Sequence, residues 1–519
     1  MHKDSIWKCL LLFSLISGSS PVHGLNILGL FIHPAISHFQ FFQPLLRRLA
    51  ETGHNVDVVS PFHDAQPPKG YTDYTLPSVN LSNQLGFDMF EDIPMPSLLP
   101  FAEFFILYAY GRDACNATLH SEALAQVLQH PAGYYDVIIV EQFNTDCMMG
   151  VAHQLQAPVV AMSSSSLMPW HYDRMGTPII PSYISALFLG QSEQMSFGGR
   201  LGNWITSHTL NWLYSWFNVP AADALLRQKF GSGIPSTGEL VKNTSLMLIN
   251  QHFSLSGAKP LPPNVLEVGG LHLRAAKPLD DALQQLLDRA EHGVILISWG
   301  SQLRANSLSN AKRDSLLRAL ARLPQQIIWK WENDTLPNQP ANVHIMKWLP
   351  QRDILAHPNV RVFFSHGGLM GLTEAVSSGV PVVGMPVYGD QFFNVAGLVQ
   401  RGMAVRLDLG QLSEQTVFDA LTQVLDPGYK LQAAKVSAAY NDRPQLAMDS
   451  ALWWVQHVAE TRGAPLLRSS AVKLNRFVYY SLDVYIALGA VLLLVLVSLL
   501  RIWRLGCGQK RQLSKAKRS

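Results

Sequence analysis

The sequence predicts an α/β protein with two parallel, doubly wound sheets and one membrane-spanning helix near its C-terminus. The 519-residue chain, at 48% hydrophobic composition, can bury two large cores. Apolar strands alternate with helices in both halves, which is typical of parallel sheets. A charge-free apolar run lies near the end. Such sheets bind ligands at the carboxyl ends of their strands, so two facing sheets predict a cleft between two domains.

The first 24 residues have the pattern of a secretory signal peptide. Lys3 and Lys8 flank the start of an apolar run, 9–16, and small residues lead to a predicted cleavage after Gly24. The run is too short to span a bilayer comfortably. A buried core strand is the alternative interpretation.

The mature chain is expected to open with a β-α-β unit. Residues 25–32 form its first predicted strand, and a helix then runs to about Glu51, where Gly53 provides a stop. The stretch 61–130 is irregular and contains prolines, which predicts loops and short helices over the sheet. The remaining strands of this sheet are expected at residues 55–60, 137–140, 159–162 and 246–250.

Residues 169–230 are rich in tryptophan and poor in charge. Part of this range is expected to form helices that line an apolar pocket or lie on a membrane surface, with ordinary core packing as the alternative.

Pro260 to Pro263 and Gly269-Gly270 mark a linker. The predicted boundaries are a first domain at 25–260, a linker at 261–285, a second domain at 286–460, a juxtamembrane segment at 461–483, a spanning helix at 484–503 and a basic tail at 504–519.

The stretch 348–391 carries the most informative pattern of the chain. A predicted strand ends in Ser365-His366-Gly367-Gly368, and a helix follows. Glycines at a strand-to-helix turn let backbone N–H groups approach a pyrophosphate, and the helix N-terminus stabilises its charge. Strands at 293–298 and 326–331, with a helix at 308–323 between them, precede this pattern.

Polar and aromatic residues around this turn suit the other parts of a nucleotide sugar. Glu374 can accept hydrogen bonds from a ribose diol, and Trp348 offers a flat face to a uracil ring. Gln351 supplies a donor and an acceptor for the edge of that ring. Asp390 and Gln391 follow the next strand, where a sugar beyond the phosphates would lie.

This ordered set resembles the signature of the UDP-glycosyltransferase family, and the resemblance covers nearly the whole chain. It implies the GT-B architecture of two facing Rossmann-like domains. It also implies that Trp348 stacks on uracil, that Gln351 and Glu374 hold the uridine, and that His366 donates to the phosphates. Met370 and Gly371 replace polar residues of many relatives, so a phosphate contact there must come from the backbone. The donor-binding set that the resemblance implies is Ser301, Trp348, Gln351, His366, Gly367, Gly368, Gly371, Glu374, Asp390 and Gln391.

The leaving diphosphate must be stabilised, and many glycosyltransferases use a metal held by Asp-x-Asp for this. The chain contains no Asp-x-Asp. We therefore expect no metal site, with the helix N-terminus, His366 and Ser301 in that role, each donor contributing roughly 3–4 kcal/mol. No cofactor is expected beyond the UDP-sugar itself as co-substrate.

His38 is the predicted base, because it lies at the turn after the first strand, which faces the cleft of a doubly wound sheet. An imidazole can accept the proton of an attacking hydroxyl, and the resemblance places a catalytic histidine here. A helix cap or a solvated residue is the alternative. The family's partner aspartate falls by strand matching at Glu141, with Asp146 as the competitor. A third interpretation is that neither carboxylate contacts His38.

The apolar run 484–500 has no charge over 17 residues and is flanked by Tyr479, Tyr480 and Trp503. The basic tail that follows contains no acid, which predicts a type I protein with a cytosolic tail and a lumenal body. Lys515 and Lys517 match dilysine retrieval signals of the endoplasmic reticulum, with a plain lipid anchor as the alternative.

Glycosylation sequons lie at Asn80, Asn116, Asn243 and Asn333. Cys115 and Cys147 are the predicted lumenal cysteines, and the sequence leaves their pairing open.

The leading hypothesis is inverting transfer of a sugar from UDP-glucose or UDP-glucuronate to a hydroxyl of a small lipophilic acceptor. Inversion is implied by the resemblance. Lys259 lies where several glucuronosyltransferases place an arginine, and it is either a ligand of the glucuronate carboxylate or solvated. The alternatives are a non-catalytic UDP-sugar or lipophile binding protein and a sugar-nucleotide epimerase. A net charge of +3 does not indicate a nucleic-acid partner, and a homo-oligomer is neither predicted nor excluded.

Overall fold

The computed structural model describes residues 24–77 and 98–516, with side chains described to residue 505. It divides into two compact units, residues 1–468 and 469–519. The predicted signal peptide, the sequon at Asn80 and Lys517 lie outside the described residues, and the side chain of Lys515 lies outside the described side chains.

The first sheet has seven parallel strands in the order β3-β2-β1-β4-β5-β6-β7. Its residues alternate between two apolar layers, with Leu28 and Val140 on one side and Ile27 and Ile139 on the other. The strands are β1 (Asn26–Leu30), β2 (Asn55–Ser60), β3 (Tyr71–Thr75), β4 (Val137–Glu141), β5 (Val159–Ser163), β6 (Thr244–Ile249) and β7 (Val265–Glu267).

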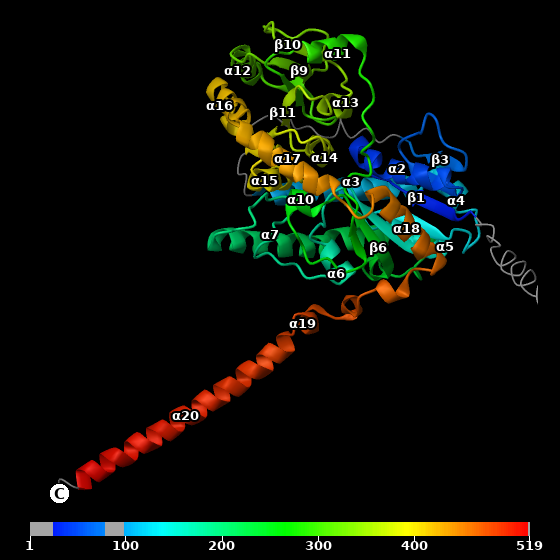
Figure 1. The fold of residues 1–519 in the computed structure, drawn as a ribbon. Coiled ribbons are helices and arrows are strands. Elements are labelled where there is room, and N and C mark those ends of the chain that lie inside the picture. The colour runs from blue at the N-terminus through cyan, green and yellow to red at the C-terminus, as the bar shows by residue number, and fades with distance from the viewer. Residues whose placement is uncertain (1–23, 78–97, 517–519) are drawn as a thin grey trace, which may run out of the picture. The chain divides into compact units, whose positions relative to one another are not determined.

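Helices cover both faces of this sheet (Figure 1). Several begin at a side-chain cap, such as Ser121 before α4 and Ser196 before α7, which satisfies backbone N–H groups of the first turn. The helical segments are α2 (Ile36–Glu51), α3 (Leu99–Leu119), α4 (Glu122–Val127), α5 (Met148–Leu155), α6 (His171–Met175), α7 (Phe197–Leu213), the π-helix η3 (Tyr214–Asn218), α8 (Val219–Phe230), α9 (Thr237–Leu240), η4 (Val241–Asn243) and α10 (Phe253–Ser256).

The second sheet has six parallel strands in the order β10-β9-β8-β11-β12-β13, so both sheets are parallel as predicted. Its strands are β8 (Val294–Ser298), β9 (Gln326–Lys330), β10 (Val343–Met346), β11 (Val360–Ser365), β12 (Val382–Gly384) and β13 (Ala404–Arg406). The helical segments of this half are α11 (Asp281–Asp288), η5 (Ala305–Ser307), α12 (Asn310–Ala321), α13 (Gln351–Leu355), α14 (Leu369–Ser377), α15 (Gln391–Gln400), η6 (Leu409–Gln411), α16 (Glu414–Val424) and α17 (Pro427–Asn441).

Two stretches of the first half differ from the sequence prediction. Within 61–130, expected to hold loops and short helices, the chain forms the strand β3 and the 21-residue helix α3. Within the predicted linker, β7 pairs in parallel with β6, so the first sheet extends past residue 260. Hydrogen bonds to neighbouring strands, which a local pattern does not reveal, stabilise both short edge strands.

The helix α18 (Ala447–Glu460) belongs to the predicted second domain by sequence but packs on the first sheet. Its buried face contributes Ala451, Val455 and Val458 to the apolar layer that contains Ile27. This helix, orange in Figure 1, packs against α2, β4 and β6. The chain therefore returns to its first half before the predicted juxtamembrane segment.

The tryptophan-rich range 169–230 contains both buried and exposed tryptophans. Trp170 is buried and stacks on Tyr214, with ring centroids 4.7 Å apart. Trp204, Trp212 and Trp216 are exposed on α7 and η3. Core packing accounts for Trp170, whereas the other three face outward.

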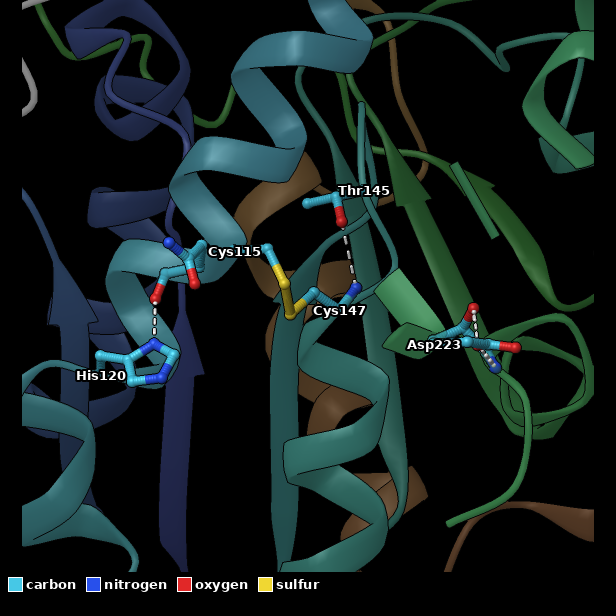
Figure 2. The surroundings of a disulfide bond; sticks show 7 residues. Cys115, His120, Thr145, Cys147 and Asp223 are labelled. Atoms are coloured by element: carbon cyan, nitrogen blue, oxygen red, sulfur yellow. Dashed lines mark hydrogen bonds between the residues drawn. A yellow bond between two sulfur atoms is a disulfide. The ribbon is translucent and has the colours of Figure 1, made fainter. Parts of the chain in front are cut away.

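A disulfide joins Cys115 and Cys147 (Figure 2). Cys115 lies in α3, and Cys147 is the residue before α5, at the end of the loop that follows β4. The bond therefore attaches α3 to the carboxyl-end loop of a central strand. This pairing settles what the sequence left open.

The last described unit contains η8 (Ser470–Lys473), α19 (Arg476–Tyr479) and α20 (Leu482–Ala516), preceded in the first unit by η7 (Pro465–Leu467). Residues Leu482–Leu505 include an 18-residue stretch with a mean hydropathy of 2.5, and the helix is long and apolar enough to cross a membrane. This range includes the predicted span 484–503.

Candidate active site

The carboxyl ends of β1, β4 and β5 bring three polar side chains together. His38, in the first turn of α2, has its Nδ1 2.6 Å from Oε1 of Glu141, the last residue of β4. The hydroxyl of Ser164, just after β5, lies 3.0 Å from the same nitrogen. Donation of the Nδ1 proton to the carboxylate leaves the lone pair of Nε2 able to accept a proton.

Two aromatic rings lie next to the His38 imidazole. The ring centroids of His33 and Phe143 lie 4.7 and 4.8 Å from that of His38. Burial, and then the charge of His38, hold the pKa of His33 well below its usual range. His33 therefore stays neutral, which avoids a second positive charge beside a protonated His38.

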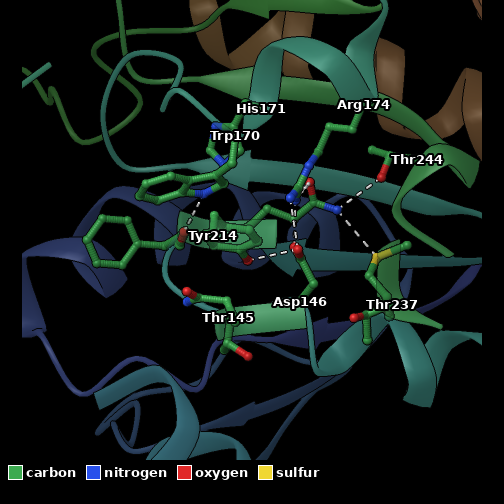
Figure 3. A network of polar contacts seen from close by, with 12 residues as sticks. Thr145, Asp146, Trp170, His171, Arg174, Tyr214, Thr237 and Thr244 are labelled. Carbon is green, nitrogen blue, oxygen red and sulfur yellow. Dashed lines mark hydrogen bonds and ion pairs between the residues drawn. The ribbon is translucent and has the colours of Figure 1, made fainter. Parts of the chain in front are cut away.

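Asp146, the competing partner for His38, lies in a separate buried network (Figure 3). Its carboxylate accepts two hydrogen bonds from the Arg174 guanidinium, at 2.6 and 2.8 Å, and one from the Tyr214 hydroxyl at 2.8 Å. The prediction of Asp146 as a catalytic partner is thus corrected. Its oxygens are used by a buried bidentate ion pair, whereas Glu141 contacts His38.

The glycine turn between β11 and α14 has the backbone that the sequence predicts. Gly367 has φ +91°, and a Cβ there would approach Val395 Cγ2 to 2.7 Å. The His366 imidazole lies against Gly300 and Gly368, since a Cβ at either glycine would come within 3.0 Å of the ring. Ser301 is exposed in the loop after β8, next to Gly300. The turn and this loop therefore frame one edge of the second sheet.

Burial, followed by the charge of Lys330, lowers the pKa of His366 from 6.5 to about 4. Its ring is therefore neutral at pH 7 and can donate a single hydrogen bond. Its Nδ1 is buried without a hydrogen-bond partner within the described part of the chain.

The lowered pKa of His366 predicts a pH effect on stability. Between pH 6.5 and about 4 the unfolded chain binds a proton that the folded ring does not, so the free energy of unfolding falls as pH falls, by at most about 1.4 kcal/mol per pH unit. Urea unfolding of the detergent-solubilised protein at pH 7, 6 and 5 measures this. Relative to His366→Gln, the wild type should lose stability towards pH 5. If the difference in the free energy of unfolding between wild type and His366→Gln stayed constant with pH, the pKa of His366 would not be lowered.

The three predicted uridine ligands lie near the start of α13 and on α14. Trp348 is 67% exposed, so one face of its indole is accessible. Gln351 Nε2 donates to Glu374 Oε2 at 2.7 Å, and a Cβ on Gly371 would lie 3.1 Å from that nitrogen. Burial raises the pKa of Glu374. The structure thus brings Gln351, Glu374 and Gly371 together, and the exposed Trp348 precedes Gln351 by three residues in the chain.

Asp390 and Gln391 lie at the start of α15, beyond the end of β12. The carboxylate of Asp390 accepts a hydrogen bond from Asn394 Nδ2 at 2.8 Å. Burial raises the pKa of Asp390, whereas the hydrogen bond from Asn394 and then the charge of His38 oppose that shift. The side-chain oxygen Oε1 of Gln391 accepts hydrogen bonds from the backbone N–H groups of Val387 and Tyr388.

Sequence reasoning missed two residues that position these groups. Ser164 contacts His38, and the run of four serines from Ser163 to Ser166, after a central strand, was the available signal. Asn394 bridges Asp390 and the Gly367 carbonyl, to which its Nδ2 donates at 3.1 Å. It lies one helical turn after Asp390, on the same face of α15.

A family model described as UDP-glucoronosyl and UDP-glucosyl transferase matches residues 89–518. The chain belongs to the UDP-glycosyltransferase family. This glycosyltransferase is 34% identical over 496 residues to UDP-glycosyltransferase UGT5 of Dactylopius coccus, covering 94% of this chain and 93% of that protein. It is also 29% identical to UDP-glucuronosyltransferase 2B16 of Oryctolagus cuniculus, covering 90% and 92% of the two chains. It is therefore an enzyme that transfers a glycosyl group from a UDP-sugar.

Solved structures confirm the GT-B architecture of this glycosyltransferase. The glycotransferase of kitacinnamycin matches with a TM-score of 0.57 at 20% identity, over 85% of this chain and 100% of that one. The calicheamicin glycosyltransferase CalG4 matches with a TM-score of 0.57 at 17% identity, over 86% and 100%. At these identities the likeness concerns the fold alone.

Proposed function

We propose that this enzyme transfers glucose or glucuronate from its UDP-sugar to a hydroxyl of a small lipophilic acceptor, with inversion and without a metal or cofactor. The observation that carries the proposal is the pair of His38 and Glu141, 2.6 Å apart at the cleft edge of the first sheet. In this role Nε2 of His38 takes the hydroxyl proton, and Glu141 orients the ring and stabilises its cation.

The diphosphate leaving group would bind at the N-terminus of α14. Backbone N–H groups near Gly367 and Gly368, the imidazole of His366 and the hydroxyl of Ser301 supply its hydrogen-bond donors. Because His366 is neutral, it contributes a dipole and a proton donor rather than a charge. With these donors bound to the diphosphate, no metal ion is needed to stabilise its charge.

The nucleoside and the sugar occupy the two ends of this turn in our proposal. Trp348 stacks on uracil, while Gln351 and Glu374, now bonded to each other, exchange that bond for uridine hydroxyls. Asp390 and the amide of Gln391 hold the sugar hydroxyls. The base then lies opposite the leaving diphosphate, so direct in-line attack would convert an α-linked donor into a β-glycoside.

An apolar acceptor site beside the base is supported by the residues around His38. Phe143, whose ring lies 4.8 Å from His38, belongs to an apolar cluster with Phe104, Trp170 and Phe188. Large aromatic side chains favour binding of flat, lipophilic molecules. A phenol bound there would present its hydroxyl to Nε2 of His38.

We propose a type I protein of the endoplasmic reticulum membrane with a lumenal body. A disulfide between Cys115 and Cys147 fits an oxidising compartment. The described sequon residues Asn116, Asn243 and Asn333 are all exposed, as glycosylation requires. The candidate span and the basic residues after it support the topology.

A donor assay tests the proposed function. Microsomes or purified full-length protein are incubated with labelled UDP-glucose or UDP-glucuronate and a panel of phenols. We expect acceptor-dependent release of UDP, a β-glycoside by NMR and no loss of rate in EDTA. Absence of UDP release with either donor would contradict the proposal as a whole. An α-glycoside would contradict inversion, and inhibition by EDTA would contradict metal independence.

A further inference from the structure

Glu103, in the second turn of α3, reaches the loop that carries the predicted sugar ligands. Its Oε1 accepts a hydrogen bond from the Gly389 N–H at 3.0 Å, although 286 residues separate the two in sequence. Its Oε2 is buried and has no hydrogen-bond partner among the residues that the structure describes. A buried carboxylate oxygen without a donor is costly. The surroundings of Oε2 therefore favour a ligand that supplies a hydrogen-bond donor to it.

The groups around Glu103 are those of the proposed sugar site. Gly389 directly precedes Asp390, and burial, together with the charge of Asp390, raises the pKa of Glu103 to about 7. The charge of His38 in turn acts on Asp390. The contact with Gly389 thus places the Glu103 carboxyl group of α3 beside the loop that carries Asp390.

Contacts along α3 hold Glu103 in place. Asn144 Nδ2 donates to the Leu107 carbonyl at 3.0 Å, and the disulfide at Cys115 fixes the same helix further on (Figure 2). Phe104, the next residue, packs in an apolar cluster with Phe393 of α15. The carboxylate is thus attached to a rigid support, as a ligand-binding group requires.

We propose that Glu103 is a donor-sugar ligand supplied by the N-terminal half, and that it selects a neutral hexose over a hexuronate. Oε1 holds the loop through the Gly389 N–H, and Oε2 accepts the hydrogen of a sugar hydroxyl. This inference rests on the proposed function, because it takes the sugar to lie beside Asp390 and Gln391.

The charges near this site explain the selection. A hexuronate would add a third carboxyl group beside Glu103 and Asp390, and like charges in a buried site repel strongly. Lys259, the cation that the sequence offered for a hexuronate, donates to Ser166 Oγ at 2.9 Å and to Gln251 Oε1 at 3.0 Å. Two of its three N–H donors are therefore already used.

The test is steady-state kinetics of full-length wild type and Glu103→Gln with UDP-glucose and UDP-glucuronate. Glutamine keeps a carbonyl oxygen for Gly389 but replaces Oε2 by an NH₂ donor. We expect wild type to prefer UDP-glucose. In Glu103→Gln, kcat/KM for UDP-glucose should fall roughly 10- to 100-fold, whereas the value for UDP-glucuronate should rise, because one of the two carboxyl groups that repel the hexuronate is removed. Glu122→Gln, an exposed change on α4, is the matched control.

Inhibition by UDP, measured on each variant, reports whether the nucleotide site is intact. An unchanged inhibition constant together with a shifted donor preference supports the inference. Three results overturn it: a wild type that prefers UDP-glucuronate, a Glu103→Gln variant that behaves like Glu122→Gln, or an equal loss with both donors and with UDP. A wild type that uses neither donor would instead contradict the proposed function.

Discussion

Replacing His38 by alanine is expected to lower kcat by about 10²–10⁴-fold, the usual contribution of a general base. The imidazole is the group that the geometry offers to take the hydroxyl proton, since Glu141 is bonded to its Nδ1. Binding of UDP should be unchanged, because the proposed nucleotide ligands all lie on the second sheet. Initial rates at saturating donor and acceptor measure the first effect, and a UDP titration measures the second.

His153→Ala is the matched control for this experiment, because His153 is exposed in the last turn of α5. It should keep the rate of the wild type. If His38→Ala retained more than a tenth of the wild-type kcat with UDP binding intact, the base would have to be another group. A loss of UDP binding would instead indicate that the substitution disturbs the second half.

The parts of the site that the sequence predicted are those that a short stretch of chain encodes. The turn at Gly367 and Gly368 is one example, since the φ of +91° at Gly367 is a local requirement. The position of His38 is another, because the carboxyl end of the first strand of such a sheet faces the cleft. In both cases one β-α unit determines which way the residue points.

Features that depend on distant residues could not be predicted in this way. The choice between Glu141 and Asp146 required Arg174, which lies 28 residues after Asp146 and pairs with it. The contact of Glu103 with Gly389 spans 286 residues. Helix α3 was missed for a different reason: its sequence, LPFAEFFILYAYGRDACNATL, is apolar on nearly all sides of its first turns and shows no clear helical period.

Replacing Asp146 by asparagine is expected to lower the free energy of unfolding by about 3–5 kcal/mol, because it leaves the buried Arg174 guanidinium without a counter-charge. The side chains of Arg174 and Asp146 are only 6% and 2% exposed, so water cannot replace the lost carboxylate. Urea unfolding of the detergent-solubilised protein measures the change. Trp170, stacked on Tyr214 beside the ion pair, is a suitable fluorescent reporter.

A surface pair provides the comparison. Asp334 pairs with Lys347, and both side chains are exposed, so Asp334→Asn should change the free energy of unfolding by at most about 1 kcal/mol. Under conditions where Asp146→Asn remains folded, its kcat should stay near that of the wild type, since its carboxylate does not contact His38. A variant with normal stability and a kcat as low as that of His38→Ala would reverse the assignment and make Asp146 the partner of the base.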